Sequence, residues 1–293
     1  MPLTKGIILA GGYGTRLYPL TYGTSKQLLP VYDKPMIYYS LSTLMNAGIK
    51  DIMIISTPND LPRFKDLFKD GKHIGLNISY AHQKNPNGIA ESLIIGADFI
   101  GNDNICLILG DNIFHGNNFI SLLDKARLNL ENNYSTIFGV EVDDPNDFGV
   151  IEFDSQNKIH NIVEKPDNAS SNIIVSGLYY YTNDVLQIAM NLKPSPRGEL
   201  EITDINNHYL AQNKLRLVKL DSETSWIDTG TYDSLMKAAK YFQDYENKTA
   251  KKVACIEEIA LNLGYIDKKK LKNTANSMKN SNYGRYLLNI LKK

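Results

Sequence analysis

The sequence predicts an α/β fold with a mainly parallel, doubly wound (Rossmann-like) sheet, on three observations. Short apolar runs without polar alternation, typical of parallel strands buried on both faces, occur at residues 7–10, 51–55 and 105–109. Amphipathic segments of helical period separate these runs, at 35–47, 61–68, 89–99 and 119–129. The glycine-rich stretch 11–14 follows the first run directly, at the sheet edge where such folds bind ligands.

The remaining elements extend this α/β pattern and then change it. Further strands are expected at 77–80 and 136–142, and from Gly149 the pattern becomes a small β sub-region. It comprises a hairpin of 149–153 with 158–164, strands 173–181, 215–220 and 226–228, and helices 184–191, 203–212 and 232–245. The polar stretch 243–252 precedes a helical tail. We therefore predict a catalytic domain over residues 1–246 and a C-terminal helical appendage over 247–293.

Composition excludes several classes of protein. The 293 residues carry no net charge, so nothing in the overall charge indicates a nucleic-acid or membrane partner. Two cysteines, Cys106 and Cys255, provide neither a disulfide framework nor zinc-ligand spacing. No apolar stretch is long enough to span a bilayer and no signal peptide is apparent, so a cytoplasmic location is expected.

The loop after the first strand indicates a phosphate-rich ligand. Gly11, Gly12 and Gly14 allow positive φ and a concave row of backbone N–H groups that binds anions. Arg16 and Lys26 add two positive charges nearby. Neither the P-loop motif nor the complete dinucleotide fingerprint G-x-G-x-x-G is present. The alternative is a purely structural turn between strand and helix.

Two aspartates follow apolar runs in the same way. Asp111 ends the run 105–109 within Gly-Asp-Asn, and Asp228 ends Trp-Ile-Asp-Thr-Gly. Carboxylates that meet at one sheet edge suit Mg²⁺, which prefers carboxylate and phosphate oxygens. A plain turn is the alternative for either aspartate alone.

Two more basic residues stand in distinctive settings. Lys165 lies between Glu164 and Pro166 at the end of a predicted strand, and Arg197 lies in a tight loop before a helix. Each is suited to hold a phosphate. An exposed lysine at a strand end, or a charge cluster at a helix N-terminus, would explain the same residues.

These motifs together resemble a known family. G-G-x-G-T-R-L-x-P with S-K-Q-L-L-P, E-K-P and S-P-R-G-E-L-E-I-T-D are similar to the signatures of sugar-1-phosphate nucleotidylyltransferases. The closest resemblance is to glucose-1-phosphate thymidylyltransferases of the RmlA type. It implies transfer of a thymidylyl group from dTTP to α-D-glucose 1-phosphate, with Mg²⁺, as the first step of dTDP-deoxysugar (dTDP-L-rhamnose-type) biosynthesis.

The resemblance also implies roles for individual residues. Catalytic roles fall to Arg16, Lys26, Lys165 and Arg197, and the metal falls to Asp111 and Asp228. The nucleotide would be bound by Leu9, Gly11, Gly12, Gly14, Thr15, Arg16, Gln83, Gly88 and Asp111. The sugar phosphate would be bound by Asn112, Gly149, Glu164, Lys165, Val175 and Arg197. In this reading Gln83 meets the base, and Gly88 lets the base approach the backbone.

The tail has an apolar side that must be buried, and members of this family are typically tetrameric and inhibited by dTDP-L-rhamnose at a second site. By resemblance we expect a homotetramer with regulatory residues Gly116, Lys252 and Cys255. A tail that only covers apolar surface is the alternative.

The chain also departs from the family pattern. Glu91 replaces the glutamine of G-L-A-Q-A, Phe148 replaces a common tyrosine, and Ile256 replaces a proline. A uridylyltransferase or another sugar nucleotidylyltransferase is the nearest alternative. A sugar-nucleotide sensor without turnover is an alternative of another class.

Overall fold

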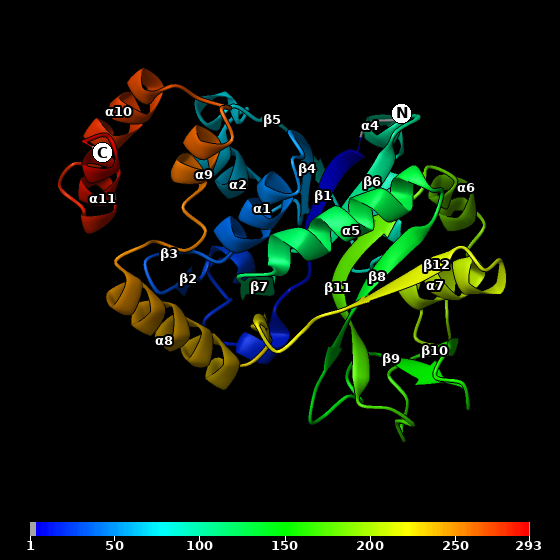
Figure 1. Ribbon diagram of the computed structural model, residues 1–293. Helices are drawn as coiled ribbons and strands as arrows, with labels where there is room; N and C mark the ends of the chain where they lie inside the picture. Colours follow the sequence, from blue (N-terminus) through cyan, green and yellow to red (C-terminus); the bar gives the residue numbers. More distant parts are fainter. Residues whose placement is uncertain (1–3, 293) are drawn as a thin grey trace.

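The computed structural model describes residues 4–292, and its centre is a parallel sheet (Figure 1). Strand β1 (Thr4–Ala10) lies between β4 (Asp51–Ser56) and β6 (Asn104–Leu109), and β5 (Asn77–His82) pairs with β4. All four strands run in the same direction. The carboxyl ends of β1 and β6 therefore meet at one edge, where the glycine loop and Asp111 begin.

The other half of the nine-stranded sheet is mixed. Strand β11 (Ile173–Tyr181) runs antiparallel to β6, β8 (Ser135–Glu141) and β9 (Gly149–Phe153). The expected hairpin is confirmed, since β9 pairs antiparallel with β10 (Ile159–Glu164). Strand β12 (Leu215–Lys219) returns parallel to β8. This half extends the sheet beyond β6 and forms one wall of the site.

Helices cover both faces of the sheet, as expected of a doubly wound fold. In β1, Ile8 and Ala10 belong to the core on one face, whereas Ile7 belongs to the core on the other. The first face is covered by α1 (Ile37–Asn46), α2 (Leu61–Phe68) and α5 (Phe119–Glu131). The second is covered by α3 (Glu91–Ile95), α4 (Ala97–Ile100), α6 (Val185–Met190) and α7 (Ile202–Ala211).

The helix expected at 89–99 is interrupted, which corrects that prediction. Gly96 separates α3 from α4, and a Cβ at this position would lie 2.8 Å from Ile7 Cδ1. A glycine therefore lets the chain pack closely on β1, and glycine is also a poor helix former. Close packing against the sheet outweighs the helical period of the sequence here.

A small β-ribbon was not expected from the sequence. Strand β7 (Asn112–Gly116) follows Asp111 at once and pairs antiparallel with β13 (Thr224–Asp228), apart from the main sheet. The hairpin of β2 (Pro30–Val31) with β3 (Lys34–Pro35) was likewise missed. The β7–β13 ribbon brings Asp228 back to Asp111 across more than a hundred residues of sequence, since Asp228 pairs with Asn112.

Helix α8 (Tyr232–Thr249) begins with a capping box between Thr231 and Ser234 and continues to Thr249, into the polar stretch 243–252 that was expected to be a separator. Glu246, in its last turn, is buried, so the polar residues of this stretch are not all solvated. Three tail helices follow: α9 (Ile256–Asn262), α10 (Lys268–Ser277) and α11 (Asn282–Ile290). Ile256, Leu271 and Leu287 join the same core as Ile8. The division at residue 246 stays a prediction.

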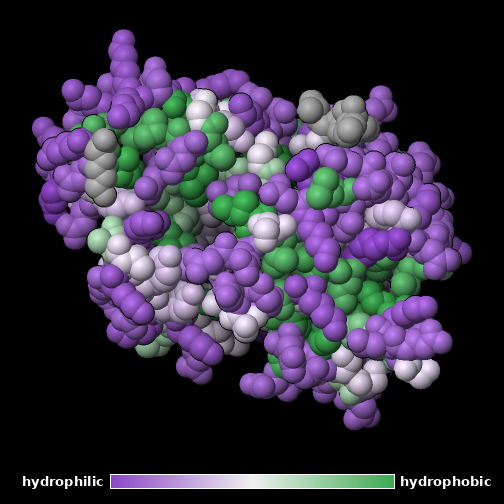
Figure 2. Space-filling model, in the orientation of Figure 1, coloured by the Kyte–Doolittle hydropathy of each residue, from purple (hydrophilic) through white to green (hydrophobic). Residues whose placement is uncertain are grey.

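The outer surface is largely hydrophilic in the orientation of Figure 1, and hydrophobic side chains gather in the area of α9 to α11 (Figure 2). Several apolar tail residues, among them Ile259, Leu288 and Leu291, are only partly buried. Within residues 4–292, no helix combines the length and the apolar character needed to cross a bilayer.

Candidate active site

The glycine loop has the backbone conformation that the sequence predicts. Gly12 and Gly14 have φ of +88° and +60°, which other residues rarely adopt. A Cβ at Gly14 would also lie 3.0 Å from Thr21 Cγ2. The loop lines a cavity of about 200 Å³ together with the side chain of Lys26. Its other predicted lining residues are Gly11, Thr15, Arg16 and Asp111.

An ion pair lies in the lining of this cavity. Lys26 Nζ is 2.6 Å from Asp111 Oδ2, and the Lys26 side chain is almost fully buried. Desolvation disfavours the Asp111 carboxylate, but the Lys26 ammonium outweighs it and holds the pKa of Asp111 below its usual value. Asp111 is therefore ionised at neutral pH.

The second aspartate has the opposite electrostatic environment. Burial, and next the negative charge of Asp111, raise the pKa of Asp228 to about 6, although Lys26 and Arg16 oppose the shift. A Cβ at Gly230 would lie 2.9 Å from Asp228 Oδ2 and 3.0 Å from an Arg16 nitrogen, so the arginine adjoins this carboxylate. Asp111 and Asp228 thus form a repelling pair that a cation would stabilise.

This pair fits Mg²⁺ in its donor set. No group of three or more His, Cys, Asp or Glu side chains arranged for a metal occurs in residues 4–292. Mg²⁺ bound with nucleotide phosphates needs only one or two carboxylates, because phosphate and water oxygens supply the rest. Asp111 and Asp228 would be those ligands.

A second cavity, of about 220 Å³, shares Arg16 and Asp111 with the first. Gly149 and Glu164 face each other across the β9–β10 hairpin at its wall. The structure brings the predicted sugar-phosphate residues together in this lining: Asn112, Gly149, Glu164, Lys165, Val175 and Arg197. The two cavities meet where Arg16 and Asp111 stand.

Arg197 and Lys165, the two cations of this cavity that were predicted to bind phosphate, differ in their ion pairs. The Arg197 guanidinium lies 3.1 to 3.5 Å from the carboxylates of Glu164, Glu199 and Glu201. Lys165 has positive φ, +42°, and no ion pair to its ammonium occurs in the described part of the chain. Of these two cations, Lys165 is therefore the one whose charge no described carboxylate neutralises.

The predicted base-binding residues lie beyond these two cavities. Gln83 is buried beside the glycine loop, with Oε1 3.0 Å from where a Cβ of Gly11 would be, and that Cβ would also lie 3.6 Å from Leu9 Cδ1. Gly88 has φ of +105°, and a Cβ there would lie 2.3 Å from Leu200 O. The close approach that demands this glycine is thus to the backbone of Leu200.

Comparison with known proteins decides the family. The nucleotidyl transferase family model matches residues 5–245. A glucose-1-phosphate thymidylyltransferase of Neisseria meningitidis is 50% identical over 99% of this chain and 100% of its own. One from Mycobacterium tuberculosis is 49% identical over 99% of both chains. This chain is a glucose-1-phosphate thymidylyltransferase family member.

Solved structures agree with this family. A putative glucose-1-phosphate thymidylyltransferase of Bacillus anthracis, in complex with a sucrose, superposes with a TM-score of 0.76. It is 40% identical and covers 82% of this chain and 96% of its own. A UDP-glucose pyrophosphorylase complexed with UDP-glucose gives 0.72 at 26% identity, over 83% of this chain and 99% of its own. The nucleotidyltransferase fold and its α/β sheet are confirmed.

Sequence reasoning missed several residues that shape this thymidylyltransferase-family site. Trp226 Nε1 donates to Asn112 Oδ1 (2.8 Å) and to Ser176 O (2.9 Å), which fixes Asn112 beside Asp111. Trp226 also packs edge-on against the ring of Phe148, the residue already noted as replacing a common tyrosine, at 5.6 Å between centroids. Thr203 donates to Glu164 Oε2. The one tryptophan of the sequence stands two residues before Asp228, and this position could have indicated that Trp226 belongs to the site.

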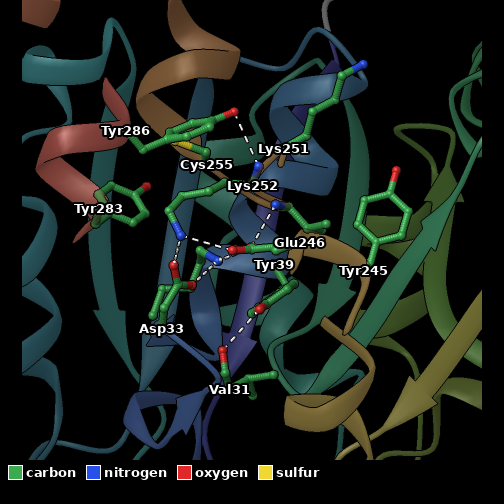
Figure 3. A network of polar contacts seen from close by, with 12 residues as sticks. Val31, Asp33, Tyr39, Tyr245, Glu246, Lys251, Lys252, Cys255, Tyr283 and Tyr286 are labelled. Atoms are coloured by element: carbon green, nitrogen blue, oxygen red, sulfur yellow. Dashed lines mark hydrogen bonds and ion pairs between the residues drawn. The ribbon is translucent and has the colours of Figure 1, made fainter. Parts of the chain in front are cut away.

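The residues predicted to be regulatory lie around a third cavity, of about 220 Å³, between β7, α1 and the tail. Gly116 and Lys252 line it, whereas Cys255 is buried beside it, and burial raises the pKa of its thiol to about 12. The Lys252 ammonium pairs with Asp33 and lies 2.9 Å from Glu246 Oε2 (Figure 3). Exposed Lys251 also lines the cavity and points away from this network (Figure 3).

Asp228→Asn is expected to stabilise the metal-free enzyme above pH 6. The raised pKa means that the folded state binds the proton of Asp228 more tightly than the unfolded state does. Ionisation of Asp228 therefore lowers the stability as the pH rises from 3.8, the ordinary pKa of this carboxyl, to about 6, its pKa in the folded protein. The gain should be on the order of 2 kcal/mol at pH 7.5 and should vanish below about pH 4.

Thermal melts in a chelator at several pH values measure this effect. Asp144→Asn, at an exposed loop position, is the matched control and should leave the melting temperature unchanged. A gain in melting temperature that is equal at pH 4 and pH 7.5 would show that the Asp228 charge is not its cause.

Proposed function

We propose that this chain transfers the thymidylyl group of dTTP to α-D-glucose 1-phosphate, giving dTDP-glucose and pyrophosphate. The observation that carries the proposal is the junction of the two cavities at Arg16 and Asp111. A triphosphate in the glycine loop would place its α-phosphate there, next to a phosphate held by Lys165. The names of the relatives at about half identity agree with this reaction.

The chemistry would be a direct in-line displacement. An oxygen of the sugar phosphate attacks the α-phosphorus of dTTP, and the bond to the bridging oxygen breaks, so that pyrophosphate leaves with the electron pair. No covalent enzyme intermediate is needed. Catalysis then comes from positioning and charge neutralisation. Arg16 and the glycine loop hold the departing pyrophosphate, Lys26 supports the triphosphate, and Lys165 and Arg197 aim the nucleophile.

Mg²⁺ held by Asp111 and Asp228 would neutralise charge on the α-phosphate. Glu164, which lines the second cavity, would accept hydrogen bonds from sugar hydroxyls. Since both substrates are cytoplasmic metabolites, we infer that the enzyme works in the cytoplasm.

Pyrophosphate release tests the function. The purified protein is mixed with Mg²⁺, each nucleoside triphosphate and each hexose 1-phosphate, and the sugar nucleotide is identified by mass. We expect the highest kcat/KM with dTTP and glucose 1-phosphate. A higher value with UTP would make the chain a uridylyltransferase, and binding of dTDP-glucose without any turnover would make it a sensor.

Asp111→Asn and Asp228→Asn should each raise the Mg²⁺ concentration for half-maximal rate by about tenfold, because an amide oxygen replaces a charged ligand at a cost of ~1.5 kcal/mol. Excess Mg²⁺ should restore part of the activity in both variants. Metal titration of the pyrophosphate assay measures the shift. Titration curves that overlay the parent's would remove the two-aspartate site.

We further propose that the third cavity binds a nucleotide sugar that inhibits the enzyme, with dTDP-L-rhamnose as the probe, and that the chain forms a tetramer through its tail. Lys251→Glu should raise the inhibitor concentration for half inhibition by about tenfold, because it reverses an exposed charge at the cavity. Steady-state kinetics measure this, and sedimentation measures the tetramer. Inhibition that is purely competitive with dTTP in parent and variant would contradict the second site.

A further inference from the structure

The side-chain amide of Gln83 is held in one orientation by two acceptors. Its Nε2 donates to Gly88 O at 3.0 Å and to Glu91 Oε2 at 2.7 Å. A carbonyl and a carboxylate can only accept hydrogen bonds. Rotating the amide by half a turn would place Gln83 Oε1 against both, replacing two hydrogen bonds by two repulsive contacts. The chemistry of the neighbours, therefore, settles which end of the amide faces them.

The opposite end of the amide faces the glycine loop. Gln83 Oε1 lies 3.0 Å from the position that a Cβ of Gly11 would take, although Gln83 as a whole is only 6% exposed. No hydrogen bond to this oxygen is formed from any donor in residues 4–292. This oxygen is not among the fully buried polar atoms of the described residues, so it reaches the surface at the glycine loop and is open to a ligand. A hydrogen-bond donor on a bound ligand could pair with it.

Glu91 is the residue that makes this orientation strict. Its other oxygen, Oε1, accepts from Asn87 Nδ2 at 2.8 Å, so the carboxylate is fixed at both oxygens. A glutamine at this position would carry one donor and one acceptor and could pair with either end of the Gln83 amide, so that only Gly88 O would still oppose the turned amide. A glutamate satisfies only one.

We propose that Glu91 is a positioning residue that turns the Gln83 carbonyl toward the nucleotide base and so selects bases that carry an N–H at ring position 3. Thymine and uracil present that donor to an acceptor, whereas cytosine presents an acceptor at the same atom. The inference rests on the proposed function, in which Gln83 meets the base. Glu91 would thus help to select the base, but it would not distinguish dTTP from UTP, because thymine and uracil both carry this N–H.

Glu91→Gln tests the proposal through a ratio of substrates. We expect the ratio of kcat/KM for dTTP to that for dCTP to fall about tenfold, because only one of the two acceptors, Gly88 O, then opposes turning the amide to donate to cytosine. The ratio of dTTP to UTP and the KM for glucose 1-phosphate should stay at the parent's values. A loss of structure would change all substrates alike and could not produce this pattern.

Controls separate the possible failures. Asp98→Asn removes an exposed carboxylate from the neighbouring helix α4 and should change none of these ratios. Asn87→Ala, which frees Glu91 at one oxygen, should move the dTTP-to-dCTP ratio in the same direction by less, and it replaces Glu91→Gln if that variant does not fold. An unchanged dTTP-to-dCTP ratio in an active variant overturns the role of Glu91 and leaves the proposed function intact.

Calorimetric binding keeps the test valid if the parent shows no turnover, which would instead overturn the proposed function. The ratio of dissociation constants for dTTP and dCTP is then compared between parent and Glu91→Gln. A tenfold smaller preference for dTTP over dCTP in the variant supports the role of Glu91, and equal ratios in the two proteins overturn it.

Discussion

Glu246→Gln is expected to lower the free energy of unfolding by about 3–5 kcal/mol, because it breaks a buried network of charges. The Glu246 side chain is only 6% exposed and lies 3.2 Å from Lys34 Nζ and 2.9 Å from Lys252 Nζ. Asp33 pairs with the same two lysines, so the four charges balance. The variant would leave two lysines, one of them fully buried, facing a single carboxylate.

Thermal and denaturant melts would measure this loss, which corresponds to a fall in melting temperature of roughly 5–15 °C. The matched control is Asp244→Asn, two residues earlier on the same helix, where the pair with Lys240 is exposed on both sides. An exposed pair of this kind is worth less than about 1 kcal/mol. Equal effects of the two substitutions would show that the buried network does not hold α8 and the tail on the body.

Lys165→Met is expected to lower kcat/KM for glucose 1-phosphate about 10- to 150-fold while leaving dTTP binding close to normal. Losing one charge-assisted contact to a phosphate costs roughly 1.5–3 kcal/mol. Lys165 lines the second cavity and forms no ion pair with any described residue, so its charge is free for the substrate. Methionine, like lysine, is strained at the positive φ of this position, so the substitution changes the side-chain charge and leaves the backbone strain as it is.

Initial rates at varied glucose 1-phosphate and calorimetry with dTTP measure the two quantities. Lys158→Met, at an exposed turn position of the same hairpin, removes an equal charge and should leave both unchanged. A parent-like rate for Lys165→Met would remove Lys165 from the site.

Local sequence patterns were sufficient to predict the fold class and to place the glycine loop and Asp111 at one edge of the sheet. Apolar runs predicted the parallel strands, because strands buried on both faces exclude polar residues. The glycines and Asp111 directly follow two of those strands, and adjacent parallel strands end at the same edge. The position of the glycine loop beside a carboxylate could therefore be predicted without coordinates.

Only the tertiary structure decided how residues distant in sequence meet. The β7–β13 ribbon pairs Asn112 with Asp228, and nothing in the local pattern of either segment specifies the other. Gly96 breaks a helix because Ile7, from strand β1, packs against it.

The contact between Gln83 and Glu91, and the pairing of Lys252 with Asp33 and Glu246, likewise depend on how loops and the tail pack. A local pattern in sequence reports on the period and burial of one segment. The charge, the orientation and the partners of a side chain depend on what other segments place beside it, and long-range packing alone decides that.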